Sequence, residues 1–380
     1  MATGETDGES TRRDFLAGRS AADALANLAQ RAADGLQGQS AVASAPSRTP
    51  VGESGGRSSR PYLIRLRRQA MACQFEVLLN AGQYPAGSAA ARNALDRVDE
   101  PEAQLSVYRE DSELSLLNRR AATAAIPIEP RLFDLLAMAQ VHWRETDGAF
   151  DITAGPLSRT WGFFRRQGRV PDQDELLSAL ESVGMRHVLL DAAHRSVRFA
   201  KPGVELNLGA IGKGYALDRA AELLSDCGIE DFLLHGGRSS VLARGGNAAG
   251  DTTEGGWTVS LEDPLRPGRT LAEFRLRDAA LGTSGTAAQF FRHGGRRYGH
   301  ILDPRSGQPA EGMFSATVVA PTAAEADALS TAFYVLGPEL SAEYCGRHQA
   351  IAALLVAASP DRDSASVTAC NFAEGALRLL

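Results

Sequence analysis

A series of short strand-like runs, interleaved with helical segments, most constrains how this chain can fold. The strand-like runs are short, apolar and bounded by Gly- or Pro-bearing turns: "QFEVLLN", "HVLLD", "SVRFA", "DFLLH", "WTVSLED", "YGHILD" and "SATVVA". Helical spacing of apolar residues appears at 131–146, at 213–226 up to Gly228, and at 323–336 up to Gly337. The order lacks the strict alternation of a TIM barrel, and predicts an α+β or α/β architecture.

The first 60 residues differ from the rest of the chain. They are rich in Ala, Gly, Ser and charged residues, and "SAPSRTPVGESGGRSSRP" is typical of a linker. We therefore predict a tail at 1–60, disordered or Ala-rich and helical, followed by one domain at 61–380.

Within this tail, "STRRDFLAG" resembles a degenerate twin-arginine export signal. The apolar stretch that such a signal needs does not follow; "RSAADALANLAQRAADGL" has the pattern of an Ala-rich amphipathic helix instead. Two locations stay open: the periplasm, if the segment directs export, and the cytoplasm, if it is a short docking helix.

Composition and charge exclude several classes of protein. The chain has 380 residues, 44% of them hydrophobic and 23% charged, as expected of a globular protein with a sizeable core. Its formal net charge of -6 argues against a general nucleic-acid binder. No run of 18 apolar residues predicts a transmembrane helix. The four cysteines are scattered and predict neither a zinc site nor a disulfide framework.

The segment "ELNLGAIGKGYALD" at 205–218 combines a bare backbone with one lysine. Glycines at a helix start let backbone N–H groups approach an anion. A Walker motif is excluded because Gly214 follows Lys213, and the spacing of Gly209, Gly212 and Gly214 does not match the dinucleotide fingerprint. By itself the segment predicts a strand, a tight turn and a helix, with or without a bound anion.

In "AEADALSTAFYVLG", Asp327 and Thr331 are four residues apart and share one helix face. Their oxygens suit Mg²⁺ or Ca²⁺, and the alternative is a hydrogen bond on a surface helix. The surrounding Ala, Leu and Phe residues predict a buried helix, where an unpaired carboxylate is costly, and this favours a ligand role.

In "RRYGHILDPRSGQP", His300 precedes a Pro-containing turn. A histidine there has the pKa of a general base, and it equally suits a structural hydrogen bond. Ser284 lies in "GTSGT", which lacks the GxSxG spacing of a nucleophile elbow, so no hydrolase triad is expected.

Taken in order, the motifs of the chain resemble one family. "MACQFEV", "LSVYREDSELSLLN", "DGAFDIT", "LNLGAIGKGYALD", "LLHGG", "GTSG", "HILDPRSGQP" and "ADALSTAFYVLG" together are similar to the ApbE family, the FAD:protein FMN transferases, from about residue 66 to 355. The resemblance implies an α+β fold of two closely associated subdomains with the FAD site between them. It also implies Mg²⁺-dependent transfer of FMN from the substrate FAD to a threonine of an acceptor flavoprotein, of the redox-complex subunit type, with release of AMP.

The resemblance also implies roles for individual residues. Contacts with FAD are expected at Met71, Tyr108, Ala149, Phe150, Asp151, Gly209, Lys213, Tyr215 and Ile301. The metal ligands implied are the backbone carbonyl of Gly212 with the side chains of Asp327 and Thr331, and the catalytic base implied is His300.

Two positions and one segment depart from the pattern of the family. Asn207 stands where the family often has Asp, Ser330 stands where some members have a second acid, and "SGTAAQFF" replaces a common segment of the site wall. Two alternative functions remain: an FAD pyrophosphatase that uses water as acceptor, and a non-catalytic FAD-binding protein. AMP release with and without an acceptor would separate these functions.

Overall fold

The computed structural model describes residues 41–42, 62–248, 255–285, 289–359 and 365–380. The predicted tail at 1–60, with its export-like motif and amphipathic helix, lies outside the described residues except for 41–42. The two-residue strand β1 (Ala41–Val42) pairs with β9 (Trp257–Glu262). The described part of the main body begins at Tyr62. Its first strand, β2 (Leu63–Ala70), starts one residue later, close to where the composition changes.

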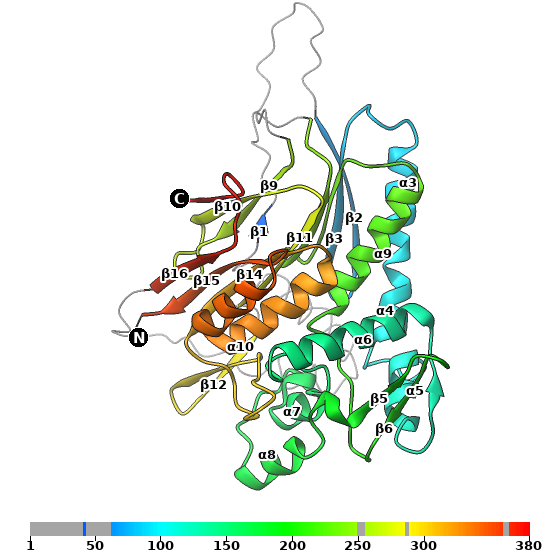
Figure 1. The fold of residues 1–380 in the computed structure, drawn as a ribbon, viewed down its shortest axis with the longest axis vertical. Helices are drawn as coiled ribbons and strands as arrows, with labels where there is room; N and C mark the ends of the chain where they lie inside the picture. Colours follow the sequence, from blue (N-terminus) through cyan, green and yellow to red (C-terminus); the bar gives the residue numbers. More distant parts are fainter. Residues whose placement is uncertain (1–40, 43–61, 249–254, 286–288, 360–364) are drawn as a thin grey trace, which may run out of the picture.

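An antiparallel eight-stranded sheet forms the centre of the fold (Figure 1). Its strand order is β16-β15-β14-β11-β8-β7-β3-β2, so the strand nearest the start of the chain, β2, and the one nearest its end, β16, lie at opposite edges of the sheet. Besides β2, its strands are β3 (Cys73–Asn80), β7 (Phe232–Gly236), β8 (Ser240–Arg244), β11 (Ala279–Gly285), β14 (Met313–Ala320), β15 (Ala352–Ala358) and β16 (Ala365–Cys370).

Three smaller sheets surround this one. The four-stranded sheet has the order β1-β9-β10-β17, a hairpin joins β12 to β13, and the three-stranded sheet has the order β4-β6-β5. The strands are β10 (Thr270–Leu276), β17 (Leu377–Leu379), β12 (Phe290–His293), β13 (Arg296–Gly299), β4 (Ile126–Pro127), β5 (Val188–Asp191) and β6 (Ser196–Phe199).

Helices cover one face of the central sheet and build the lower part of Figure 1. They are α3 (Gly87–Arg97), α4 (Asp99–Leu105), α5 (Glu113–Arg120), α6 (Pro130–Glu145), α7 (Gly155–Thr160), α8 (Gln173–Leu180), α9 (Gly212–Asp226) and α10 (Ala323–Arg347), with 3₁₀ turns η1 (Phe163–Arg165) and η2 (Met185–His187). Helices and antiparallel sheets together confirm the α+β prediction.

Three apolar clusters hold these layers together. The largest lies between the sheet and helices α3, α6, α9 and α10, and includes Phe75, Leu217 and Phe333. A second cluster, which includes Trp257, packs the opposite face of the sheet against β9 and β10. A third, around Trp161, joins α7 and α8 to the β12–β13 hairpin. Because α9 and α10 lie in the first cluster, the core fixes where their N-termini sit.

Most strands and helices predicted from the sequence are present, with two corrections. The strand predicted for "YGHILD" ends at Gly299, so His300 lies just after β13 and not within a strand. The helix predicted to stop at Gly337 is only broken there: Gly337 adopts φ 78°, Pro338 follows, and a second helical segment continues to Arg347. Glycine accommodates this positive φ, which lets the chain turn without ending the helix.

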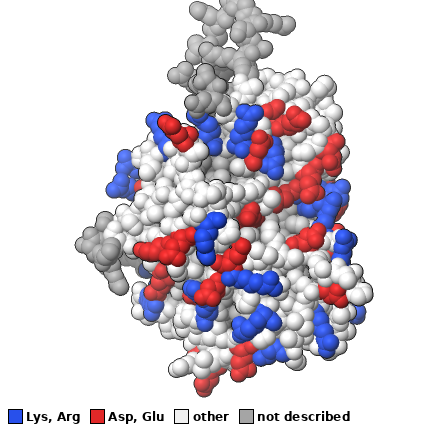
Figure 2. Space-filling view, in the orientation of Figure 1, with Lys and Arg blue, Asp and Glu red and all other residues white. Residues whose placement is uncertain are grey.

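Charged side chains of both signs are interspersed over the face shown in Figure 2, where neither sign forms a continuous field. Across the described part of the chain, no helix combines the length and apolar character needed to span a bilayer.

Candidate active site at the start of helix α9

The turn before α9 is held by its own polar groups. The Asn207 side chain accepts a hydrogen bond from the Gly209 N–H at 2.9 Å, and the Asn207 N–H donates to the Ile152 carbonyl at 2.7 Å. Asn207 therefore orients the loop by hydrogen bonding. The loop delivers Gly212 and Lys213 at the first turn of α9.

Helices α9 and α10 approach each other closely at Gly214. A Cβ atom on Gly214 would lie 2.1 Å from the Ala323 carbonyl oxygen, so only glycine fits. The Gly214 N–H donates to Asp327 Oδ2 at 2.8 Å. This N–H belongs to the first turn of α9, whose donors have no partner within the helix. The buried carboxylate of α10 thus caps α9.

Asp327 is held at the bottom of the site by a short chain of polar groups. Its side chain is 5% exposed, and Oδ1 accepts a hydrogen bond from Ser240 Oγ at 2.7 Å. Lys213 Nζ donates to Ser240 Oγ at 3.0 Å and to Ser239 Oγ at 2.7 Å. Burial raises the pKa of Asp327, and the positive charge of Lys213 opposes that rise.

Three hydroxyl groups lie next to Asp327 on the same helix face and the facing strand. Ser284 Oγ of β11 lies 2.9 Å from Ser330 Oγ and 3.2 Å from Thr331 Oγ1. Thr331 Oγ1 and Ser330 Oγ also donate to the Asp327 carbonyl, at 3.2 and 3.0 Å. A Cβ on Gly282 would lie 2.5 Å from the Ala326 carbonyl, so glycine in β11 permits this close packing.

Backbone oxygens are the remaining candidate ligands. Gly212 is the first residue of α9. In a helix, each backbone carbonyl ordinarily accepts a hydrogen bond from the N–H four residues further along the chain. For Ala210 that donor would be the Gly214 N–H, which Asp327 takes instead. Within the described residues, no backbone N–H donates to the Ala210 carbonyl. The Gly212 assignment stays a prediction, and Ala210 offers a second acceptor two residues away.

This donor set fits a small, hard cation. It consists of one carboxylate, hydroxyls and backbone carbonyls, without a soft ligand, and oxygen ligands are those that Mg²⁺ prefers. Among the described residues, no group of three or more His, Cys, Asp or Glu side chains could hold a metal by itself. A single buried carboxylate matches a site that substrate phosphate completes, which is the usual arrangement for Mg²⁺.

His300, which follows β13 directly, is held in a form suited to accept a proton. Its Nδ1 is 3.0 Å from the Gln289 carbonyl oxygen, which can only accept, so Nδ1 carries the proton. Nε2 is then the unprotonated nitrogen. Burial lowers the pKa of His300; the Gln289 hydrogen bond raises it and the charge of Lys213 lowers it again.

Met71 and Ile301 border the same region. A Cβ on Gly212 would lie 3.4 Å from Met71 Cε, so Met71 packs against the α9 turn from the β2–β3 hairpin. Ile301 follows His300, packs against the main apolar cluster and accepts a hydrogen bond from the Ala310 N–H at 2.9 Å.

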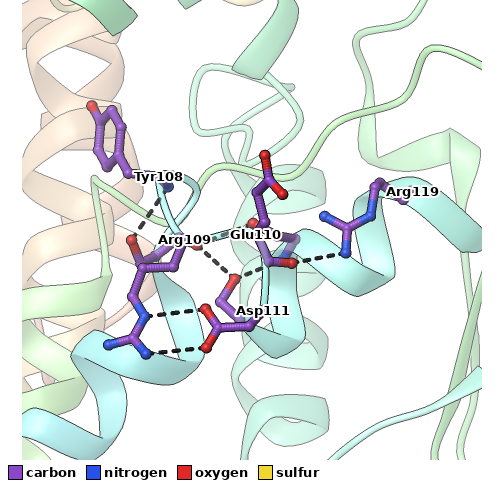
Figure 3. Close-up of polar contacts among 8 residues, drawn as sticks. Tyr108, Arg109, Glu110, Asp111 and Arg119 are labelled. Atoms are coloured by element: carbon purple, nitrogen blue, oxygen red, sulfur yellow. Dashed lines mark hydrogen bonds and ion pairs between the residues drawn. The ribbon is translucent and has the colours of Figure 1, made fainter.

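Tyr108 lies on the loop between α4 and α5 (Figure 3). Arg109 pairs with Asp111, and Arg119 donates to the Glu110 carbonyl at 2.8 Å, while the Tyr108 ring projects away from these contacts. The ring is 71% exposed and stacks on Phe164 with centroids 4.7 Å apart. An exposed aromatic ring can stack on a planar ligand.

In the segment of Ala149, Phe150 and Asp151, two residues are buried and the third is hydrogen-bonded within the fold. Ala149 and Phe150 are each 1% exposed, so they present almost no surface to a ligand in this structure. Asp151 Oδ1 accepts from the Thr153 N–H and Oγ1 at 2.8 and 2.6 Å, and Oδ2 accepts from the Met185 N–H at 3.2 Å. Burial raises the pKa of Asp151, and these hydrogen bonds oppose the rise.

Tyr215 lies apart from the other predicted FAD contacts. It lines a cavity of about 500 Å³ between α6 and α9, with Leu135, Leu242 and Arg244 among its neighbours. Neither Lys213, Asp327 nor His300 lines this cavity. Lys213 and Tyr215 therefore lie on different sides of α9: Lys213 faces the candidate site, and Tyr215 faces the cavity.

The site contains serines that the sequence analysis did not single out as site residues: Ser239 and Ser240. They follow the "LLHGG" motif, separated from it by one residue, Arg238. The only signal was their position at a strand start beside two glycines, which does not reveal contact with residues 26 to 87 positions away.

The fold and geometry define the class as an α+β protein in which a lysine and a buried carboxylate meet near the starts of two helices, α9 and α10. A sequence model of the ApbE family matches residues 71–355. The chain belongs to the ApbE family.

Similar proteins of known sequence and structure agree with this assignment. The chain is 33% identical over 249 residues to the FAD:protein FMN transferase of Salmonella typhimurium, covering 64% of this chain and 70% of that protein. It is 33% identical to the FAD:protein FMN transferase of Treponema pallidum, covering 70% and 77%. The crystal structure of the Pseudomonas stutzeri flavinyl transferase ApbE, apo form, has a TM-score of 0.72 at 28% identity, covering 83% of this chain and 96% of that one.

Proposed function

We propose that this chain is an FAD:protein FMN transferase that attaches the FMN half of FAD to a threonine of an acceptor protein and releases AMP. The observation that carries the proposal is the contact of Lys213 and Asp327 through Ser240 at the start of α9, in a member of the ApbE family. Relatives with this name and a flavinyl transferase structure with the same fold support transfer over the pyrophosphatase and non-catalytic alternatives.

The reaction is a displacement at phosphorus. The threonine oxygen forms a bond to the phosphorus next to the flavin, and the bond from that phosphorus to the AMP oxygen breaks. Lys213 offsets the negative charge of the pyrophosphate, and the His300 Nε2 accepts the threonine proton. Tyr108 offers a ring on which the flavin stacks, and Met71 borders the α9 turn.

Asp327, Thr331 and a backbone carbonyl at Gly212 would hold Mg²⁺, which when bound neutralises phosphate charge and polarises the phosphorus. Asp327 contributes the only side-chain carboxylate of this set. Its burial makes a cationic partner favourable, since an ionised group away from water is costly unless paired.

The test is to incubate the protein with FAD, Mg²⁺ and a candidate flavoprotein domain, then to measure AMP and flavin fluorescence of the acceptor in a denaturing gel. We expect a fluorescent acceptor band and AMP in equal molar amounts. AMP without a fluorescent band would support the pyrophosphatase, and FAD binding without AMP would support the non-catalytic protein. An acceptor with its threonine replaced by alanine is the matched control.

A further inference from the structure

Ser240 occupies an unusual position between the two charged groups of the site. It is 0% exposed, at the first residue of β8, where it pairs with Gly236 on one side and Gly282 on the other. Its hydroxyl accepts a hydrogen bond from Lys213 Nζ at 3.0 Å and donates one to Asp327 Oδ1 at 2.7 Å. A hydroxyl has one proton to donate, and here that proton is committed to the carboxylate.

The two neighbouring glycines explain why the hydroxyl reaches both partners. Gly236 and Gly282 add no side chain next to Ser240, and Gly282 lets α10 approach β11 so closely that a Cβ would lie 2.7 Å from the Asp327 N atom. Helix α10 therefore lies directly over the start of β8. The strand pairing, and not a flexible loop, sets the distance between Ser240 and Asp327.

Within the described residues, the Asp327 carboxylate accepts only two hydrogen bonds, one from the Gly214 backbone N–H and one from the Ser240 hydroxyl. One bond goes to each carboxylate oxygen, which leaves each oxygen further lone pairs for a cation. The Gly214 bond comes from the backbone and cannot be lost by substitution of its side chain. Ser240 is thus the one side chain that fixes the carboxylate rotation.

We propose that Ser240 is a positioning residue that orients Asp327 to bind the divalent cation, and that links the carboxylate to Lys213. The inference rests on the proposed function because it assumes the metal role of Asp327. Partners that hold a ligating carboxylate typically change metal affinity by 10–100-fold when removed. A merely structural Ser240 would affect folding stability and leave the affinity of the folded protein for the cation unchanged.

The test measures Mn²⁺ binding by the disappearance of the free-ion electron paramagnetic resonance signal, with FAD present and no acceptor. We expect Ser240→Ala to weaken Mn²⁺ binding about 10–100-fold. In the transfer assay we expect the apparent KM for Mg²⁺ to rise more than kcat falls. Ser240→Cys keeps the side-chain volume close to that of serine and replaces the hydroxyl by a weak donor, so it decides the matter if the alanine variant does not fold.

Ser239→Ala is the matched control. Ser239 Oγ accepts a hydrogen bond from Lys213 Nζ at 2.7 Å, whereas the Asp327 carboxylate is bonded by Gly214 and Ser240, so loss of the Ser239 hydroxyl should leave Mn²⁺ affinity near that of the unchanged protein. Equal Mn²⁺ affinity of Ser240→Ala, or of Ser240→Cys, and the unchanged protein would overturn the inference. So would an unchanged protein that binds no Mn²⁺.

The two proposals fail in different ways. An unchanged protein that binds Mn²⁺ but transfers no flavin would contradict the proposed function, while a loss of affinity in Ser240→Ala would still support the role of Ser240. Normal transfer with unaltered Mn²⁺ affinity in Ser240→Ala would contradict only the role of Ser240.

Discussion

Replacing His300 by Asn separates a catalytic role from a structural one. In the structure, Nδ1 of His300 donates to the Gln289 carbonyl at 3.0 Å, and an Asn amide can supply a similar donor. The contact that orders this segment can therefore survive. What the substitution removes is Nε2, the nitrogen that would accept the threonine proton. We expect normal folding and FAD affinity, with slower transfer.

The magnitude follows from the role of a general base. Proton transfer to a positioned side chain typically contributes about 10²–10⁴-fold, or about 3–5 kcal/mol of the activation barrier. Asp303, three residues after His300 in the sequence, is an alternative base, but Arg305 engages it: Nε and Nη2 of Arg305 donate to Oδ1 and Oδ2 at 2.9 Å each. Rescue by Asp303 is therefore not expected.

The pH dependence has a definite sign. Burial lowers the pKa of His300 below its ordinary value of about 6.5, so the neutral, proton-accepting form dominates at pH 7.5. The rate should be flat through neutral pH and fall as the pH drops below the lowered pKa. His300→Asn should lack this acidic limb.

The assay is single-turnover FMN transfer across pH 5–9, with FAD affinity and melting temperature measured on the same preparation. A folded His300→Asn protein that transfers flavin at nearly the unchanged rate would refute the base assignment. Weakened FAD binding and a lower melting temperature with near-normal turnover would identify a structural histidine.

Three further predictions concern the metal ligand, the helix junction and the tail. Asp327→Ala removes the one carboxylate assigned to Mg²⁺, and turnover should drop by about 10² or more; unchanged activity in EDTA would contradict the assignment. Gly214→Ala places a Cβ 2.1 Å from the Ala323 oxygen, and should lower the free energy of unfolding by about 1–3 kcal/mol in urea titration; an equal urea midpoint would refute the close approach. A chain that begins at Arg60 should keep FAD binding and AMP release, since no predicted site residue precedes it; loss of both would place the tail in the site.

Local sequence patterns predicted much of the fold. The apolar spacing of 131–146 places Leu132, Leu135, Leu136 and Ala139 in the core, as α6 shows. The errors lie where local signals end: Gly337 breaks α10 without stopping it, and β13 ends before His300. Glycine permits a turn but does not require the helix to end, and packing against the sheet decides whether it resumes.

The sequence by itself determined the family, the α+β class and the order of the motifs, because these depend on residue patterns within short windows. Only the tertiary structure decided which side chains meet. Asp327 bonds to Gly214 and Ser240 across 113 and 87 residues of chain, and no local pattern records such contacts. Tyr215 lies two residues from Lys213, yet the rotation of α9 in the core directs it to a different cavity. Close packing of helix on sheet sets these relations, since it fixes each helix face and each distance at once.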